Sequence, residues 1–306
     1  MKRGVRTAVL AIPLILCFLL LEAQAENWHL VVNNTKIHRA QMSVFVLPQE
    51  PIKIEYTGRK SLRLSSKDMQ FASKRKGIYI AQAPSESGIY QLEIQDVANS
   101  RIVQVSVVVM VPYEKMEAGY LEGYRIDDYP KEPLKGLKQY ERPRGFIRIM
   151  EDNLDQQLSP HFTFEQFLCK QQSSYPKFIV VSTATLQMLE SFLDFLNARG
   201  YDIDTFGVIS GYRTPYYNRL IRNVVYSRHI YGDAMDLFID KDNDGSMDDL
   251  NGDGKFNGED VAVLYNLAKE FHKENKAYIG GIGKYLQTSA HTEFIHMDNR
   301  GYVARW

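Results

Sequence analysis

The sequence predicts two folded domains, an antiparallel β-sandwich followed by a domain in which helices and strands alternate. Three observations lead to this prediction. The chain has 306 residues, which is long enough for two domains with separate cores. Its first third, up to residue 112, alternates polar and apolar residues in short runs separated by turn residues. From residue 146 onward, apolar repeats of helical spacing are mixed with short apolar runs typical of strands.

Residues 1–25 have the features of a secretory signal peptide. A basic start is followed by an apolar run from Ala8 to Leu21 and by Ala23-Gln24-Ala25, a pattern that signal peptidase cleaves. An uncleaved anchor is the alternative, but a run of 14 residues interrupted by Pro13 is short for a bilayer that needs about 20. We therefore expect an exported protein, periplasmic or extracellular, with no transmembrane segment after signal removal.

Charge and cysteine content narrow the classes of protein further. Formal net charge is zero for the whole chain, so no nucleic-acid partner is expected. Without the signal peptide the chain keeps only Cys169, and no internal disulfide can form although the compartment is oxidising. Cys169 follows Phe164, Phe167 and Leu168 in an apolar helical pattern, so it is interpreted as a core residue.

Residues 26–112 form the predicted all-β sandwich, with about seven short strands. The clearest strands are expected at Met42–Leu47, Ile52–Tyr56, Ile78–Ala81, Ile89–Ile94 and Ile102–Val111. The segment Ser87–Leu92 resembles the tyrosine-corner entry to a late strand of immunoglobulin-like domains, without their cysteine pair. Another all-β topology is the alternative, and nothing in these residues identifies a binding partner.

Residues 113–145 are rich in tyrosine and proline and show little periodicity. A free linker would rarely carry so many aromatic residues, so this segment is interpreted as an ordered connector that packs on a domain face.

Residues 146–306 predict an α+β domain with a small, largely antiparallel sheet. Thr163 and Gln166 have the spacing of a capping box at the start of a helix. A second helix carries leucines on one face from Leu186 to Leu196 and ends before Gly200. Further elements are expected as strands at 206–210, 234–239, 278–282 and 294–297, and as a helix at 260–274.

A set of polar residues in this domain has the composition of a zinc site. The motif is Ser227-x-His229-x-x-Gly232-x-Ala234-x-Asp236, followed 57 residues after the aspartate by Glu293-Phe294-Ile295-His296. Two histidines and a carboxylate suit zinc with one position left for water. Glu293 is expected on the bend that leads into a strand, because residues 293 and 296 of a regular strand face opposite sides.

This spacing resembles that of the M15-type zinc peptidases of peptidoglycan, whose fold is shared by the hedgehog signalling domain. The resemblance implies that His229, Asp236 and His296 bind zinc and that Glu293 is the general base. Residues 210–214, Ser-Gly-Tyr-Arg-Thr, resemble the family segment whose arginine lies beside the substrate carbonyl, so Arg213 is expected to stabilise the oxyanion. Ser227 and Asp298 are candidates to orient the ligand imidazoles, with turn-capping or surface positions as the alternative.

The resemblance covers residues 146–306, and the ending after His296 is similar to that of a murein endopeptidase subgroup. It implies a metallopeptidase of the bacterial cell envelope, a D,D-carboxypeptidase or endopeptidase, that hydrolyses peptide bonds in stem peptides or cross-links of peptidoglycan. The alternative is a non-catalytic cell-wall-binding or interaction protein that retains the fold and the metal site, as hedgehog domains do. The sequence does not identify which bond is cleaved.

Residues 240–260 form an acidic insertion that typical members of this family lack. In a twelve-residue calcium-binding frame, positions 1, 3, 5, 7, 9 and 12 are Asp249, Asn251, Asp253, Lys255 through its carbonyl, Asn257 and Asp260. The frame resembles a dockerin-type loop. It repeats nine residues earlier with Asp240, Asp242, Asp244, Ser246, Asp248 and Asn251, an overlap that resembles thrombospondin type 3 repeats.

Both frames place a glycine at the tight turn in position 6, Gly245 and Gly254, which random acidity would not do. We therefore expect one calcium ion, and a second where the overlapping frame also closes. A solvated acidic loop is the alternative. The insertion has eight carboxylates and two lysines, so it should be repelled open without a cation, and calcium should have a structural role.

Overall fold

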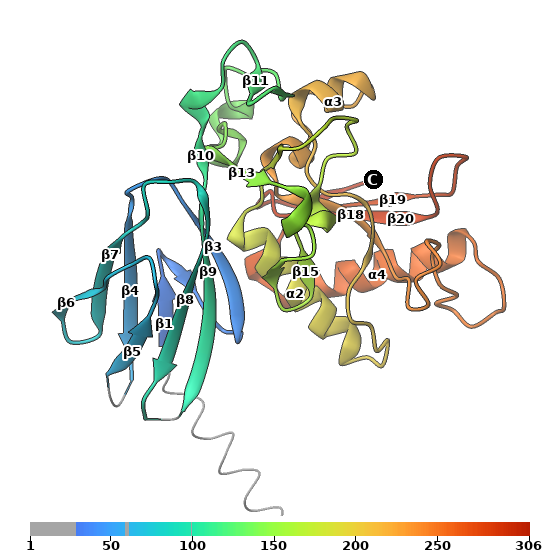
Figure 1. Cartoon of the computed structure of the whole chain (residues 1–306). Helices are drawn as coiled ribbons and strands as arrows, with labels where there is room; N and C mark the ends of the chain where they lie inside the picture. Colours follow the sequence, from blue (N-terminus) through green and yellow to red (C-terminus); the bar gives the residue numbers. More distant parts are fainter. Residues whose placement is uncertain (1–28, 59–60, 99) are drawn as a thin grey trace, which may run out of the picture.

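The computed structural model describes residues 29–58, 61–98 and 100–306. The expected signal peptide at residues 1–25 therefore lies outside the described residues. The described part is rich in strands, which form several separate sheets, and it has two long helices (Figure 1). Within these residues no helix combines the length and the apolar character needed to cross a membrane.

Two sheets form the first region of the molecule. One has the strand order β2-β1-β4-β7-β6 and the other β3-β9-β8-β5, and they face each other in Figure 1. The bounds are β1 His29–Val32, β2 Thr35–Lys36, β3 Gln41–Val46, β4 Pro51–Thr57, β5 Leu62–Ser65, β6 Ala72–Arg75, β7 Ile78–Gln82, β8 Gly88–Asp96 and β9 Arg101–Val109. Alternate residues are buried, as Ile52, Ile54 and Tyr56 are in β4, so each sheet has one apolar face.

The pairing of β3 with β9 is parallel, which corrects the expectation of a wholly antiparallel sandwich. The alternation of residues sets which face of a strand is buried, whereas its direction depends on the connections, which the sequence pattern does not encode. The hydroxyl of Tyr90 donates to the carbonyl of Glu86 at 2.9 Å, the upstream bond that a tyrosine corner makes.

The connector is ordered and its aromatic residues are largely buried. It follows β10 Val111–Pro112, and its elements are η2 Tyr113–Lys115, β11 Tyr120–Leu121, β12 Tyr124–Arg125, η3 Leu134–Gly136 and η4 Lys138–Tyr140. Tyr124, Tyr129 and Tyr140 are each at most 5% exposed. The hydroxyls of Tyr129 and Tyr212 lie 2.9 Å apart, so the connector is bonded to the last region of the chain.

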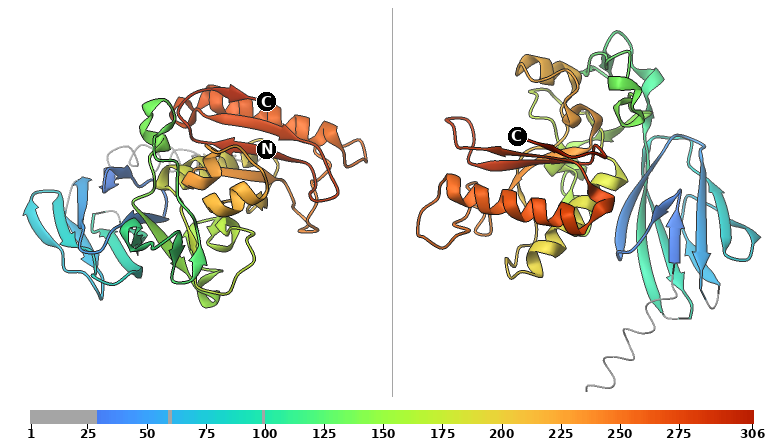
Figure 2. Two further views of the ribbon diagram at one scale, coloured as in Figure 1. Left: turned by 90° about the horizontal axis from the view of Figure 1, so that it is seen from above. Right: turned by 180° about the vertical axis from the view of Figure 1, so that it is seen from behind.

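The last region is built around a five-stranded sheet of order β17-β18-β20-β19-β21. Its elements are β13 Gly145–Ile149, η5 Glu151–Asn153, β14 Gln157–Ser159, β15 Phe162–Thr163, η6 Glu165–Phe167, β16 Lys177–Ile179, α2 Thr183–Asn197, β17 Gly207–Ser210, α3 Pro215–Leu220, η7 Arg228–Tyr231, β18 Ala234–Phe238, α4 Gly258–Glu274, η8 Lys276–Tyr278, β19 Gly281–Tyr285, β20 Phe294–Asp298 and β21 Ala304–Arg305. Helix α4 packs against β19 and β20, along one face of this sheet (Figure 2).

Local sequence signals explain α2 but not the predicted helix before it. The Ser182 side chain caps α2 by accepting the Thr185 backbone N–H at 3.1 Å, and the leucine face is buried, as expected. Gln166 does accept the Thr163 backbone N–H at 3.0 Å. However, Thr163 belongs to β15, and only one 3-10 turn follows, so the predicted capped helix is wrong.

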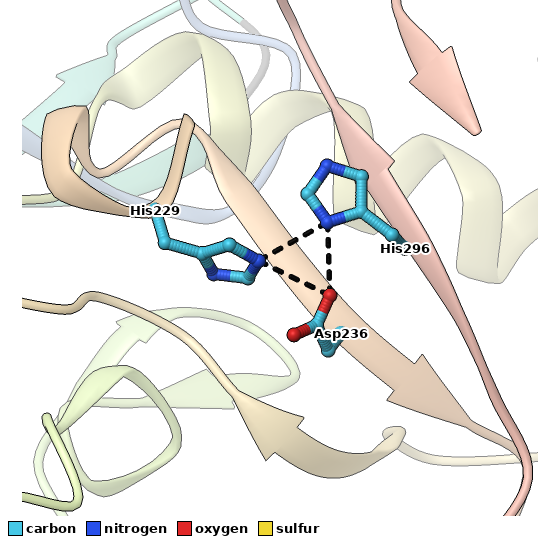
Figure 3. A group of neighbouring side chains, drawn as sticks. All are labelled: His229, Asp236 and His296. Atoms are coloured by element: carbon cyan, nitrogen blue, oxygen red, sulfur yellow. Dashed lines mark hydrogen bonds and ion pairs between the residues drawn. The ribbon is translucent and has the colours of Figure 1, made fainter. Parts of the chain in front are cut away.

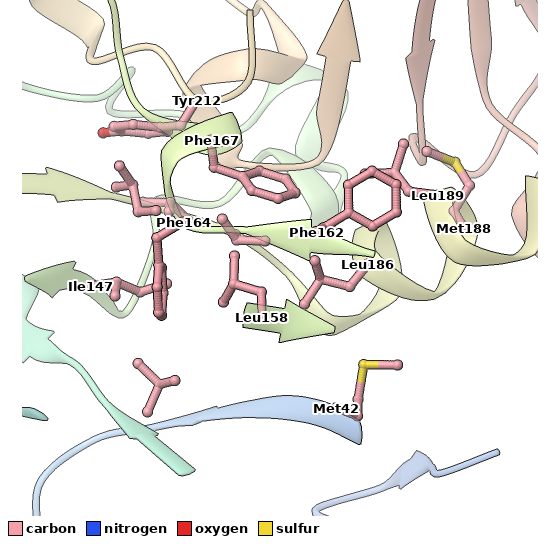
Figure 4. Packing of buried hydrophobic residues seen from close by; sticks show 14 of the residues in the cluster. Met42, Ile147, Leu158, Phe162, Phe164, Phe167, Leu186, Met188, Leu189 and Tyr212 are labelled. Atoms are coloured by element: carbon pink, nitrogen blue, oxygen red, sulfur yellow. The ribbon is translucent and has the colours of Figure 1, made fainter. Parts of the chain in front are cut away.

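The first and last regions share an interface at β3. Met42 of β3 lies near Leu158 and Leu186 of the last region, whose aromatic core continues away from it (Figure 4). The Ser43 hydroxyl donates to the Leu158 carbonyl at 2.7 Å. Arg39 makes an ion pair with Asp194 of α2 at 2.5 Å. The last region is thus held against β3 of the first region and the residues that precede this strand.

Candidate metal site

Three side chains from three elements meet on one face of the central sheet. His229 lies in η7, Asp236 in β18 and His296 in β20 (Figure 3). Asp236 and His296 are directly opposite in the antiparallel pair, which places their side chains on the same face. His229 Nε2 is 3.1 Å from both Asp236 Oδ1 and His296 Nδ1, and the last two atoms are 2.9 Å apart. All three residues are buried, and they form a group able to hold a metal ion.

The other ring nitrogen of each histidine fixes which atom carries the proton. His229 Nδ1 lies 2.6 Å from the Gly211 carbonyl, which can only accept, so Nδ1 donates and Nε2 has a lone pair. His296 Nε2 lies 2.8 Å from Asp298 Oδ2 and donates to this carboxylate, which leaves the lone pair on Nδ1. In the neutral tautomers, two nitrogen lone pairs and a carboxylate oxygen point at one another, an arrangement that either a metal ion or a proton on one imidazole stabilises.

The distances suit zinc. Zinc lies about 2.0–2.1 Å from its nitrogen and oxygen ligands, and tetrahedral geometry then separates two ligand atoms by about 3.3 Å. The separations of 2.9 to 3.1 Å are within a few tenths of an ångström of that value. A point about 2 Å from all three atoms lies roughly 1 Å outside their plane. The donor set and its spacing therefore fit the expected ion.

The electrostatics of the group agree with cation binding. Burial raises the pKa of Asp236, but the two histidines more than offset it, so this pKa lies well below its usual value and the carboxylate is ionised. Burial lowers the pKa of His229, which favours the neutral imidazole. Burial also opposes the charged form of His296, but hydrogen bonds to Asp236 and Asp298 raise its pKa to about 9. Without a metal, His296 thus holds a proton in the position that a metal would take.

Gly232 allows the chain to turn from His229 into the strand of Asp236. It ends η7 with a φ of 68°, a left-handed conformation that favours glycine. A Cβ at this position would lie 2.1 Å from the Val180 carbonyl oxygen, so no other residue fits without movement of the backbone. The glycine of the sequence motif therefore sets the distance between the two ligand-bearing elements.

Arg213 lies at the site, where its guanidinium bonds Asp236, one of the three candidate metal ligands. It is 8% exposed and donates from Nε to the Ser210 hydroxyl at 2.8 Å. Its Nη2 forms a short ion pair with Asp236 Oδ2, the oxygen that does not face the histidines. Neither bond uses Nη1. The guanidinium therefore orients the Asp236 carboxylate and retains one nitrogen for another acceptor.

The group opens onto a cavity of about 780 Å³. Arg213, His229, Asp236 and His296 line it, together with apolar side chains from several segments. Among them are Ile221, Val224 and Val225 after α3, and Tyr285, Phe294, Tyr302 and Trp306 from β19, β20 and the C-terminal segment. A mostly apolar cavity with a few convergent polar groups is the usual form of a site for a small ligand or substrate.

Two of the expected site residues lie outside the group. Glu293 immediately precedes β20 and is 6% exposed, and its carboxylate accepts the Thr292 hydroxyl at 3.1 Å. Among the described residues, Glu293 is not one of those that line the cavity. Ser227 begins η7 and does line the cavity, but no side-chain hydrogen bond in the described part of the chain joins it to either imidazole. Asp298, in contrast, bonds His296 as the sequence suggests.

The acidic insertion contains the same turn twice. Asp240 accepts the backbone N–H groups of Asp244 and Gly245 at 2.9 and 3.0 Å. Nine residues later, Asp249 accepts those of Asp253 and Gly254 at 3.2 and 2.7 Å. Both glycines have positive φ, 86° and 78°. The repeat found in the sequence is therefore also a repeat of backbone geometry.

The two frames differ in how their side chains meet. Asp240, Asp242 and Asp244 form a group whose carboxylate oxygens lie within 4.8 Å of one another. Among the described residues, Asp249, Asp253 and Asp260 form no such group. Asp260, position 12 of the second frame, is fully buried and accepts the backbone N–H groups of Leu250, Asn251 and Asn257. It thus caps α4 and closes the loop through hydrogen bonds.

Several contacts at the site were not predicted. Arg228 pairs with Asp233, and both occupy variable positions of the motif, where two opposite charges five residues apart were the available sequence signal. Leu134 and Tyr140 of the connector also line the cavity, and only the high aromatic content of that segment hinted at such a role.

Comparisons of this chain with protein-family models, with curated proteins and with solved structures found no match. The assignment of an activity therefore depends on the residues of the site and on the resemblance of their motif.

Proposed function

We propose that this protein is an exported zinc-dependent peptidase that hydrolyses peptide bonds in the stem peptides or cross-links of bacterial peptidoglycan. The observation that carries the proposal is the convergence of His229 Nε2, His296 Nδ1 and Asp236 Oδ1, each oriented by a second partner. In this proposal residues 146–306 have the α+β fold of the M15 and hedgehog group, residues 26–112 are an immunoglobulin-like sandwich, and residues 113–145 connect them.

Each residue of the site has a distinct task in this reaction. His229, Asp236 and His296 would hold the ion, which when bound supplies a Lewis acid and a water of lowered pKa. Asp298 and the Gly211 carbonyl keep both imidazoles in the tautomer that a ligand needs. Arg213 Nη1 is available to the oxyanion that forms at the scissile carbonyl. Glu293 is assigned the proton transfer, because its carboxylate would accept a proton from the attacking water and then donate it to the leaving amine.

A metal-binding protein without activity is the second candidate, and the position of Glu293 favours it. Since its carboxylate bonds Thr292 and does not line the cavity, proton transfer requires the side chain to turn toward the bound water. An interaction protein that keeps the fold and the metal has no need of that movement.

The two candidates are separated by Glu293→Gln, measured for zinc content and for cleavage of purified muropeptides by mass spectrometry. A peptidase keeps its zinc and loses at least about a hundredfold in kcat, because the removed group is a proton acceptor. A native rate in this variant contradicts the assignment of the base. A wild-type protein that binds zinc and cleaves none of the muropeptides is an interaction protein.

A further inference from the structure

The segment at residues 139 and 140 of the connector lies between the two parts of the chain that carry the histidines. Arg228 precedes His229, and its guanidinium donates from Nη2 to the Gln139 carbonyl at 2.8 Å. The side chain of Gln139 donates in turn to the Arg300 carbonyl at 2.9 Å, two residues after Asp298. A single residue of the connector is thus bonded to both histidine-bearing segments.

Tyr140 makes the same bridge with its side chain. Its ring lies against the Arg228 guanidinium, with Cζ 4.1 Å from the ring centroid, and against the ring of Tyr231 at 5.5 Å. Its hydroxyl lies 2.9 Å from that of Tyr302 in the C-terminal segment. Tyr140 and Arg228 are each 2% exposed, so the contact between the ring and the guanidinium is made away from water, where it is strongest, whereas Tyr302 is 39% exposed.

The contacts at both ends of the bridge lead on to the two histidines of the site. On one side, Arg228 pairs with Asp233 and fixes η7, the turn that carries His229. On the other side, Arg300 donates from Nε to Asp298 at 2.8 Å, and Asp298 accepts from His296. The relative position of the two imidazoles therefore depends on the connector as well as on the sheet.

We infer that Tyr140 is a positioning residue for the metal site, which holds the His229 segment and the His296 segment at the separation that the ion requires. The inference rests on the proposed zinc site. It makes residues 113–145 a part of that site, although the resemblance to zinc peptidases covers only residues 146–306. Leu134 and Tyr140 also line the cavity, so a chain without the connector would lose one wall of it.

Zinc affinity, measured by competition with a chelator, tests the inference without any need for turnover. We expect about a tenfold weaker affinity in Tyr140→Leu, which removes ring and hydroxyl, and about threefold in Tyr140→Phe, by analogy with partners that orient ligands. Tyr302→Phe removes the other end of the same hydrogen bond, so it should match Tyr140→Phe, and the double variant should be no weaker than either. Tyr120→Phe, at an exposed tyrosine of the same connector, is the matched control and should bind as the wild type does.

The melting temperature, measured in parallel, separates positioning from a purely structural role. Variants that melt earlier but bind zinc with the wild-type affinity overturn the inference and leave the proposed function intact. Additive losses in Tyr140→Phe and Tyr302→Phe also overturn it, because the two hydroxyls would then act independently. If Tyr140→Leu does not fold, the two phenylalanine variants decide alone. A wild-type protein that binds no zinc contradicts both the inference and the proposed function.

Discussion

The buried histidine–aspartate group and the acidic insertion hold their ligand atoms in opposite ways. In the buried group, each ligand residue has a second partner outside the group, namely Gly211, Asp298 or Arg213. In the insertion, Asp240 and Asp249 accept hydrogen bonds from backbone N–H groups of their own turns. Most of the insertion is exposed, and Met247 is the one fully buried side chain between residues 241 and 259.

This difference indicates what a cation would do in each place. The buried ligands are fixed by the fold, so a metal there changes chemistry more than it changes structure. In the insertion, mutual repulsion of the carboxylates opposes the folded loop, so a cation there contributes mainly to stability. The expected effects of substitution therefore differ in kind, and the following predictions start from the largest.

Loss of a zinc ligand should abolish both metal binding and activity. In His229→Ala or Asp236→Ala, zinc content should fall from about one ion per chain to almost none, because two remaining ligands hold zinc poorly. The measurement is elemental analysis after gel filtration. His291→Ala is the control, since His291 lines the same cavity outside the group and should leave the zinc in place. Full zinc content in His229→Ala would show that the ion is bound elsewhere.

Arg213→Lys should lower kcat about ten- to a hundredfold while zinc remains bound. A lysine keeps the positive charge, but it cannot donate to Ser210 and Asp236 and still offer a nitrogen to an oxyanion. Steady-state kinetics on a muropeptide substrate measures the change. An unchanged kcat with a raised KM would assign Arg213 to substrate binding in the ground state.

Asp298→Asn should weaken zinc binding about tenfold and leave the stoichiometry unchanged. The amide oxygen can still accept from His296 Nε2, but the negative charge that makes the imidazole a better ligand is lost. Chelator competition gives the dissociation constant, and Asp194→Asn on the exposed face of α2 is a control of equal charge change. Equal zinc affinities in Asp298→Asn and Asp194→Asn would show that Asp298 pairs with Arg300 and does not strengthen His296 as a metal ligand.

The sequence predicted the three residues of the buried group better than it predicted the long-range contacts around them. The resemblance of the motif to that of zinc peptidases pointed to His229, Asp236 and His296, and the structure brings these three residues together. Met42, Arg39 and Tyr140 meet their partners across more than eighty residues of chain, and no local pattern encodes such contacts. Glu293 shows the same limit, because its motif position was readable but the direction of its side chain was not.

Short-range signals were reliable where one local interaction dominates. The Ser182 cap and the leucine face were sufficient for α2, and α4 begins at Gly258, two residues before the predicted Asp260. The same kind of signal failed at Thr163, because pairing of β15 with β14 fixed that residue in a strand. Tertiary contacts therefore overrode the capping box. The direction of β3 was predicted wrongly for a similar reason, because it depends on the position of β9, which is far from β3 in the sequence.

The smallest expected effect, a change in stability with calcium, tests the insertion. Extracellular loops of this type bind calcium at about 10⁻⁴–10⁻³ M, so 10 mM calcium should stabilise the folded protein by about 2 kcal/mol. For a chain of this size that corresponds to a rise in Tm of about 5 °C. Zinc must be kept saturating throughout, because a loss of the buried ion would lower Tm for a different reason.

Paired substitutions show which frame is responsible for that rise. Asp249→Ala with Asp253→Ala removes the second frame, and Asp240→Ala with Asp242→Ala removes the first, whose carboxylates already lie together. Asp152→Ala with Asp155→Ala, two exposed aspartates elsewhere, is the control for charge alone. If calcium binds one frame, only one pair abolishes the rise in Tm. If calcium binds both frames, each pair of substitutions removes about half of the rise in Tm, since mass action applies to each ion separately. A Tm that does not change between micromolar and 10 mM calcium would make the segment a solvated acidic loop, and its repeated turns would then be stabilised by the hydrogen bonds that Asp240 and Asp249 accept from backbone N–H groups.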